Sequence, residues 1–206
     1  AVEGLEVVTS AFKPYVVPIS VGAIIALFAL QRSGTSKVGA IFGPITIIWF
    51  VVLSVTGICS IVQNPVVLNA INPLYALHFL TNHGFASFII LGAVVLCVTG
   101  AEALYSDLGH CGKNNIRISW IFVKSMLVLN YFGQGAWLIA HQGQRLSDFK
   151  ANNPFYAIMP ESFLPIGIIV ATIAAVIASQ ALISGSFSLI NEAMRLNLWP
   201  KVKVKY

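Results

Sequence analysis

The sequence predicts an all-α protein, a polytopic bundle of transmembrane helices, from its composition, its apolar runs and the charges of its loops. Of the 206 residues, 57% are hydrophobic and only 9% are charged. In soluble domains about a quarter of the residues are charged, so water is not the main solvent of this chain. We therefore expect a lipid bilayer to surround it.

Five apolar runs follow one another along the chain, each close to the length of a membrane span. They cover residues 15–30, 41–62, 85–104, 118–140 and 163–183. A hydrocarbon core about 30 Å thick needs about 20 residues of helix. Because backbone polar groups find no water in lipid, helix is the structure that fits such runs. Residues 1–206 are thus predicted to be part of a single transmembrane domain with about five spans.

Both ends of the chain indicate a piece of a longer protein. It begins at Ala1 without an apolar signal region, and it stops within the basic segment 201–206. We expect at least one span to precede Ala1.

The loops between the runs predict the orientation, because Lys and Arg collect on the cytoplasmic side of a membrane. Alternate loops hold eight basic residues against three in the other set. The eight are Arg32, Lys37, Lys113, Arg117, Arg195, Lys201, Lys203 and Lys205, and the three are Lys13, Arg145 and Lys150. The first set is predicted to be cytoplasmic, with Ala1 outside. Since the net charge of +5 is spread between apolar runs, it does not indicate nucleic-acid binding.

Two predicted exterior loops contain an Asn-Pro pair, Asn72-Pro73 and Asn153-Pro154. The residue before proline disfavours helix, so each pair predicts a helix start. A short helix at the membrane interface is the alternative for both.

Glu102 is an acidic residue inside the third apolar run. An ionisable group in a bilayer costs about 3 kcal/mol on insertion scales, so it marks a functional site by default. Thr99 and Gly100 precede it, and such a pair lets a helix unwind and turn carbonyls toward a cation. We expect a break between about residues 98 and 103 and an oxygen-only cation site at Thr99 and Glu102. The alternative is an interfacial carboxylate at the end of a shorter span.

Polar residues also interrupt the fourth and fifth runs. Asn130 and Gln134 share one helix face, next to Tyr131, and either interhelical hydrogen bonds or a polar pathway would explain them. Ser179 and Ser184 lie in a small-residue stretch, where helix packing is the first interpretation and the lining of an inner vestibule the second. The sequence shows no phosphate-binding glycine loop, zinc-ligand spacing or catalytic triad, so we expect no enzyme and no cofactor.

Several segments in one order resemble the KUP/HAK/KT family of potassium permeases. They are TGAEALYSDLGHCG at 99–112, LNYFGQGA at 129–136, NPFY at 153–156 and IASQALISGSFSL at 177–189, joined by NPLYALHFL at 72–80 and FALQRSGTSKVGAIFGP at 28–44. The resemblance covers essentially the whole chain. It implies a LeuT-like inverted-repeat fold, of which this piece would hold spans four to eight of twelve.

The resemblance also implies a function and roles for the polar residues. The function is secondary active potassium uptake across the cytoplasmic membrane, as potassium/proton symport. Thr99 and Glu102 match the family's ion-site threonine and acid, and Glu102 would also take the coupling proton. From the polar residues of the fourth and fifth runs, and not from the resemblance, we expect a pathway lined by Asn130, Tyr131, Gln134, Ser179 and Ser184.

The expected partners are the potassium ion, the proton and the lipid bilayer, with a homodimer left open. Family motifs of the first, third and tenth spans have no counterpart here, so the piece alone is not expected to transport. The alternative is an amino-acid or amine permease of the same fold.

Overall fold

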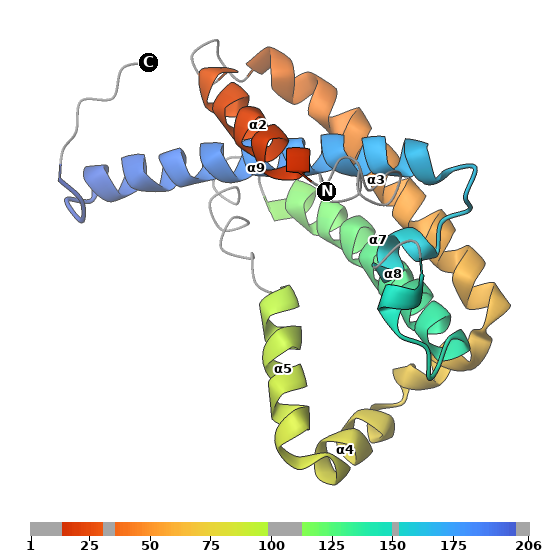
Figure 1. The fold of residues 1–206 in the computed structure, drawn as a ribbon. Coiled ribbons are helices and arrows are strands. Elements are labelled where there is room, and N and C mark those ends of the chain that lie inside the picture. Colours follow the sequence, from red (N-terminus) through yellow and green to blue (C-terminus); the bar gives the residue numbers. More distant parts are fainter. Residues whose placement is uncertain (1–13, 31–35, 99–112, 150–152, 201–206) are drawn as a thin grey trace. The chain divides into compact units, whose positions relative to one another are not determined.

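The computed structural model describes residues 14–30, 36–98, 113–149 and 153–200. All regular secondary structure in these ranges is helical, which confirms the all-α class (Figure 1). The chain divides into two compact units, one made of Ala1–Asn69 with Ile121–Ala178 and the other of Ala70–Trp120 with Ser179–Tyr206.

Long helices dominate the first unit. Its elements are α2 (Val16–Leu30), α3 (Ser36–Gln63), most of α7 (Lys113–Ala140), the 3-10 turn η4 (Leu146–Asp148), α8 (Pro154–Ala157) and the first half of α9 (Leu164–Arg195). The second unit contains α4 (Pro73–Asn82), α5 (Gly84–Val98), the first turns of α7 and the second half of α9, and the 3-10 helix η3 (Pro65–Ile71) joins the units.

The predicted runs locate the helices, and the helices extend beyond them into polar sequence. α7 ends at Ala140, where the predicted run ends, whereas α3 and α9 are longer than runs 41–62 and 163–183. Hydropathy reports which residues suit lipid, and a helix can continue past them. The ends of long helices are therefore set by local backbone chemistry.

The C-terminus of α9 illustrates this chemistry. Asn197 has a φ of 58°, in the left-handed region that asparagine tolerates. The Leu198 N–H donates to the Ala193 carbonyl at 2.9 Å, and the Asn197 N–H donates to the Met194 carbonyl at 3.2 Å. This is the Schellman arrangement, which satisfies the last carbonyls of a helix. It ends α9 well beyond the predicted position 183.

Two described helical stretches, Phe42–Gln63 and Leu164–Arg195, are long and apolar enough to cross a membrane, and Val16–Ala26 and Gly84–Leu96 are shorter apolar helices. α7 is absent from this group because Lys124, Asn130 and Gln134 interrupt its apolar sequence. The end of the third predicted run, residues 99–104, lies outside the described residues. The number of five spans therefore stays a prediction.

Both Asn-Pro pairs start a helix, as predicted. Asn72 has extended backbone and its Oδ1 accepts from the Leu74 N–H at 3.1 Å, and Asn153 Oδ1 accepts from the Phe155 N–H at 3.0 Å. These are N-cap bonds followed by proline at the first helical position. The helices are short, ten residues in α4 and four in α8.

Helical structure also fills most of the segment between the second and third runs, which the sequence predicted as a loop. η3 precedes Asn72, and α4 and α5 are joined at Gly84, whose φ of +49° favours glycine. Ser87 of α5 donates its hydroxyl to the Phe79 carbonyl of α4 at 3.0 Å. The turn between α4 and α5 is thus fixed by hydrogen bonding as well as by backbone conformation.

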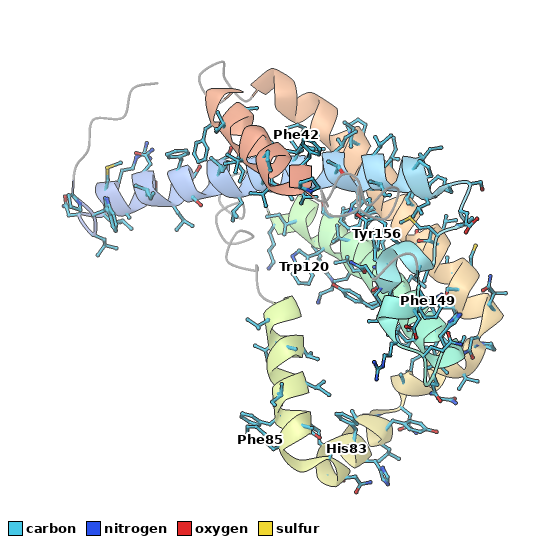
Figure 2. All side chains as sticks on the ribbon, in the orientation of Figure 1. Phe42, His83, Phe85, Trp120, Phe149 and Tyr156 are labelled. Carbon is cyan, nitrogen blue, oxygen red and sulfur yellow. The ribbon has the colours of Figure 1, made fainter. Side chains whose placement is uncertain are left out.

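The core of the first unit lies where α8 meets α3 and the start of α9. Tyr156, Met159 and Ile168 are buried there, and Val52 of α3 packs against them. The rings of Trp49 and Phe155 lie 5.6 Å apart between centroids, which also places α8 against α3. Figure 2 labels Tyr156 on α8. The core fastens the segment after α7 onto α3.

Candidate functional site

The predicted cation site lies outside the described residues. Thr99, Glu102 and the expected helix break all fall within 99–112, and the described part of α5 ends at Val98. Their assignment therefore stays a prediction. Other polar residues that the structure describes lie on α3 and α7 in the first unit and on the second half of α9 in the second unit.

On α7, the three predicted pathway residues have different surroundings. Asn130 is buried, with 4% of its surface exposed, and its Oδ1 has no hydrogen-bond partner among the described residues. Gln134, one turn later, is half-buried, and Tyr131 is 56% exposed. Asn130 and Gln134 thus lie on the inward side of α7, and Tyr131 lies on its outer side.

α3 and α7 pack side by side in parallel, as Figure 1 also shows. Phe50 and Phe122 are in edge-to-face contact at 6.1 Å between centroids, and farther along α7 the Nδ2 of Asn64, the residue directly after α3, donates to the Ala136 carbonyl at 3.2 Å. Residue numbers rise together along the two helices, so their directions agree. The apolar runs 41–62 and 118–140, which lie in α3 and α7, both begin after loops predicted to be cytoplasmic. That orientation requires the two helices to run in the same direction, as they do.

Two glycines form the centre of this crossing. A Cβ placed on Gly57 would lie 2.5 Å from the carbonyl oxygen of Leu129, and a Cβ on Gly133 would collide with the Gly57 backbone. No side chain separates the helices at this point. Small residues permit such close approach between membrane helices.

Hydrogen bonds from the end of α3 and from the residue after it to the backbone of α7 accompany the glycine contact. Ser60 donates its hydroxyl to the Gly133 carbonyl at 2.8 Å, and the Asn64 amide donates to the Ala136 carbonyl. Ser60 is buried and Ala136 is fully buried. These α7 carbonyls lie within the helix, so the side chains of α3 add a second donor to each.

The sequence interpretation did not single out Gly57, Ser60 and Asn64. The signal was present, because Ser54, Gly57, Ser60 and Asn64 are spaced three or four apart and so share one helix face. Only some of these residues contact α7. Ser54 instead donates to the Val51 carbonyl of its own helix at 3.0 Å.

The end of α7 is held by aromatic and polar contacts. The Trp137 and His141 rings stack at 4.3 Å, and Phe149, labelled in Figure 2, meets the Trp137 ring edge-on at 4.8 Å. His141 Nδ1 donates to the Trp137 carbonyl at 2.8 Å, which satisfies one of the last acceptors of the helix. Val67 of η3 is buried, and a Cβ placed on Gly135 would lie 3.1 Å from its Cγ2 atom. This end of α7 is fixed on several sides.

In the second unit, α9 carries the two predicted serines. Ser179 is exposed, and Ser184 is half-buried and accepts a 3.1 Å bond from Ser188 at its carbonyl. Gln180, which was not among the predicted site residues, is 6% exposed, and its Oε1 lacks a hydrogen-bond partner in the part of the chain that the structure describes.

The chemistry of these described residues is that of neutral oxygen groups. In the described ranges no three His, Cys, Asp or Glu side chains cluster as metal ligands. Buried amide oxygens such as Asn130 Oδ1 are acceptors, so they suit a proton donor, a water molecule or a hard cation. These neutral polar groups lie on helices that are otherwise rich in apolar residues, a composition typical of the helices of membrane proteins.

Comparison with known proteins agrees with this class. The whole chain, residues 1–206, matches the family described as the K+ potassium transporter integral membrane domain. The chain belongs to this family, which confirms the resemblance seen in its motifs. It is therefore part of a multi-pass protein of a bacterial cell membrane, and its family is one of transporters and not of enzymes.

Relatives include proteins named "Probable potassium transport system protein Kup". The one from Flavobacterium psychrophilum is 61% identical over 192 residues, which are 92% of this chain and 29% of that protein. Those from Flavobacterium johnsoniae and Cytophaga hutchinsonii are 58% and 55% identical over 100% of this chain and 32% and 31% of their own lengths. The chain thus spans about a third of these curated relatives. No solved structure matches it.

Proposed function

We propose that the protein to which this chain belongs takes up potassium across the cytoplasmic membrane by secondary active transport. The observation that carries the proposal is the match of all 206 residues to the potassium transporter domain. Relatives named for potassium transport support it. A LeuT-like inverted-repeat fold, with about five spans in this chain, belongs to the same proposal.

The cation site in this proposal consists of Thr99, Glu102 and backbone carbonyls beside Gly100. Potassium is a hard cation that prefers oxygen ligands. A broken membrane helix supplies backbone carbonyls as ligands, whereas in a continuous helix these carbonyls accept hydrogen bonds within the helix. Glu102 also takes up the coupling proton, so transport is potassium/proton symport. A potassium ion favours the charged carboxylate, whereas protonation removes that charge, and the two ligands are therefore coupled through one side chain.

The polar residues of α7 and α9 line the pathway to this site in our proposal. Support comes from Asn130, whose buried Oδ1 lacks a partner in the described ranges. A buried acceptor without a hydrogen bond costs about 1–3 kcal/mol of stability. An ion, a water molecule or another part of the protein that binds this acceptor would offset the cost. Gln180 Oε1 is in the same situation in the second unit, next to the predicted Ser179. Gln134, Tyr131 and Ser184 complete the proposed lining.

An amino-acid or amine permease is the second candidate, and substrate uptake separates the two. Full-length protein in cells without other potassium uptake systems should accumulate potassium or labelled rubidium. Amino acids added in excess should not compete. Accumulation of an amino acid without rubidium uptake would contradict the proposal.

A further inference from the structure

The contact between α3 and α7 combines three features: a backbone contact, hydrogen bonds and aromatic packing. The Gly57 and Gly133 backbones touch, Ser60 and Asn64 donate to α7 carbonyls, and Phe50 packs on Phe122 at the other end of the contact. All of these contacts lie within the first unit. They run from Phe50 to the C-terminal end of α3.

We propose that Ser60 and Asn64 are positioning residues that keep α7 bound to α3 through the transport cycle, so that Asn130 moves with α3 as part of one rigid helix pair. The proposal rests on the proposed function, because it concerns the motions of transport.

Register is the first physical reason. A slip by one helical turn would bring Leu129 or Trp137 to the place that Gly133 occupies against Gly57. The crossing has no room there even for a Cβ, so neither side chain fits. Sliding of the two helices past each other is therefore blocked in both directions.

Buried donors are the second reason. Separation of the helices would leave the Ser60 hydroxyl without the Gly133 carbonyl at a position that is 7% exposed. The glycine surfaces would also lose their contact, and no side chain could fill the gap between them. Separation would cost free energy for two reasons: buried polar groups would lose their hydrogen bonds, and packed surfaces would lose their contacts.

A covalent link across the crossing tests the proposal in the full-length protein. Phe50→Cys with Phe122→Cys, in a background with Cys59, Cys97 and Cys111 changed to serine, provides thiols for a short bifunctional thiosulfonate. We expect rubidium uptake by the cross-linked protein to equal that of the same variant before treatment. Each single-cysteine variant treated with the reagent is the matched control. Loss of uptake on cross-linking, reversed by reduction, would overturn the proposal.

A second measurement does not depend on transport activity. Spin labels at Val62→Cys on α3 and Leu138→Cys on α7, both at exposed positions, report the separation of the helices. We expect the same distance distribution with and without potassium and at acidic and neutral pH. A shift in that distribution would overturn the rigid pair. Failure of rubidium uptake by the full-length protein without substitutions would instead count against the proposed function, and the label distances would still decide this inference.

Discussion

Ser60 on α3 donates its hydroxyl to the carbonyl of Gly133 on α7 at 2.8 Å, one helical turn beyond the contact of Gly57 with α7. A hydrogen bond between membrane helices contributes about 0.6 kcal/mol on average. Ser60→Ala should therefore lower the thermal stability of the full-length protein in detergent slightly but measurably. Ser125→Ala is the matched control, since Ser125 donates only to Ile121 of its own helix. Equal melting curves for both variants would show that the interhelical bond adds nothing.

Gly57→Ala should have a much larger effect than Gly43→Ala in the same helix. The new Cβ at Gly57 meets the Leu129 backbone, which cannot move aside as a flexible side chain would, whereas nothing lies within 4 Å of a Cβ at Gly43. Overpacking costs about 1–3 kcal/mol. Thermal unfolding followed by size-exclusion chromatography should show a clear loss for Gly57→Ala alone. A wild-type profile for that variant would contradict the close crossing.

Asn130→Leu separates a structural role from a role in the pathway. The substitution removes a buried oxygen that has no hydrogen-bond partner among the described residues and keeps a similar volume, so the folded protein should be as stable as the wild type or more stable. Rubidium uptake should nevertheless fall, because the pathway loses a polar group. Asn114→Leu, at an exposed position in the first turn of α7, is the control. Full uptake in Asn130→Leu would remove Asn130 from the pathway.

The orientation can be tested by labelling in intact cells. A cysteine at Asn82, the exposed last residue of α4, should react with an impermeant maleimide in a background without native cysteines. A cysteine at Ser36, at the start of α3, should react only after the membrane is opened. The reverse pattern would invert the topology predicted from the loop charges.

Much of the helical structure could be predicted from composition and loop chemistry. The Asn72 and Asn153 caps were predictable because proline restricts the residue before it, and that restriction is local. The extension of α9 to Arg195 was not, because it depends on the backbone bonds around Asn197 and not on hydropathy. The end of a helix depends on the hydrogen bonds of a few backbone groups, and an average of hydropathy over many residues does not detect them.

The crossing of α3 and α7 shows the same limit for the site. Asn130 was singled out because a polar residue in an apolar run indicates either an interhelical hydrogen bond or a polar pathway, and the structure places it at a buried position. Ser60 and Gly57 were overlooked because small residues with this spacing also occur on helices that face lipid. Only the partner helix shows that they face Gly133. The pattern of polar and apolar residues within one apolar run does not show which other helix that run will contact.

Potassium uptake as a function of external pH, measured in proteoliposomes with wild type and Glu102→Gln, tests the central claim most directly. Glutamine keeps the size and polarity of the side chain but cannot take up a proton. We expect wild-type accumulation to depend on pH and Glu102→Gln to lose proton-driven accumulation, with passive exchange retained at most. Glu192→Gln, which removes an exposed carboxylate 3.6 Å from Arg195, should behave as wild type. Identical accumulation and pH dependence in wild type and Glu102→Gln would contradict the account.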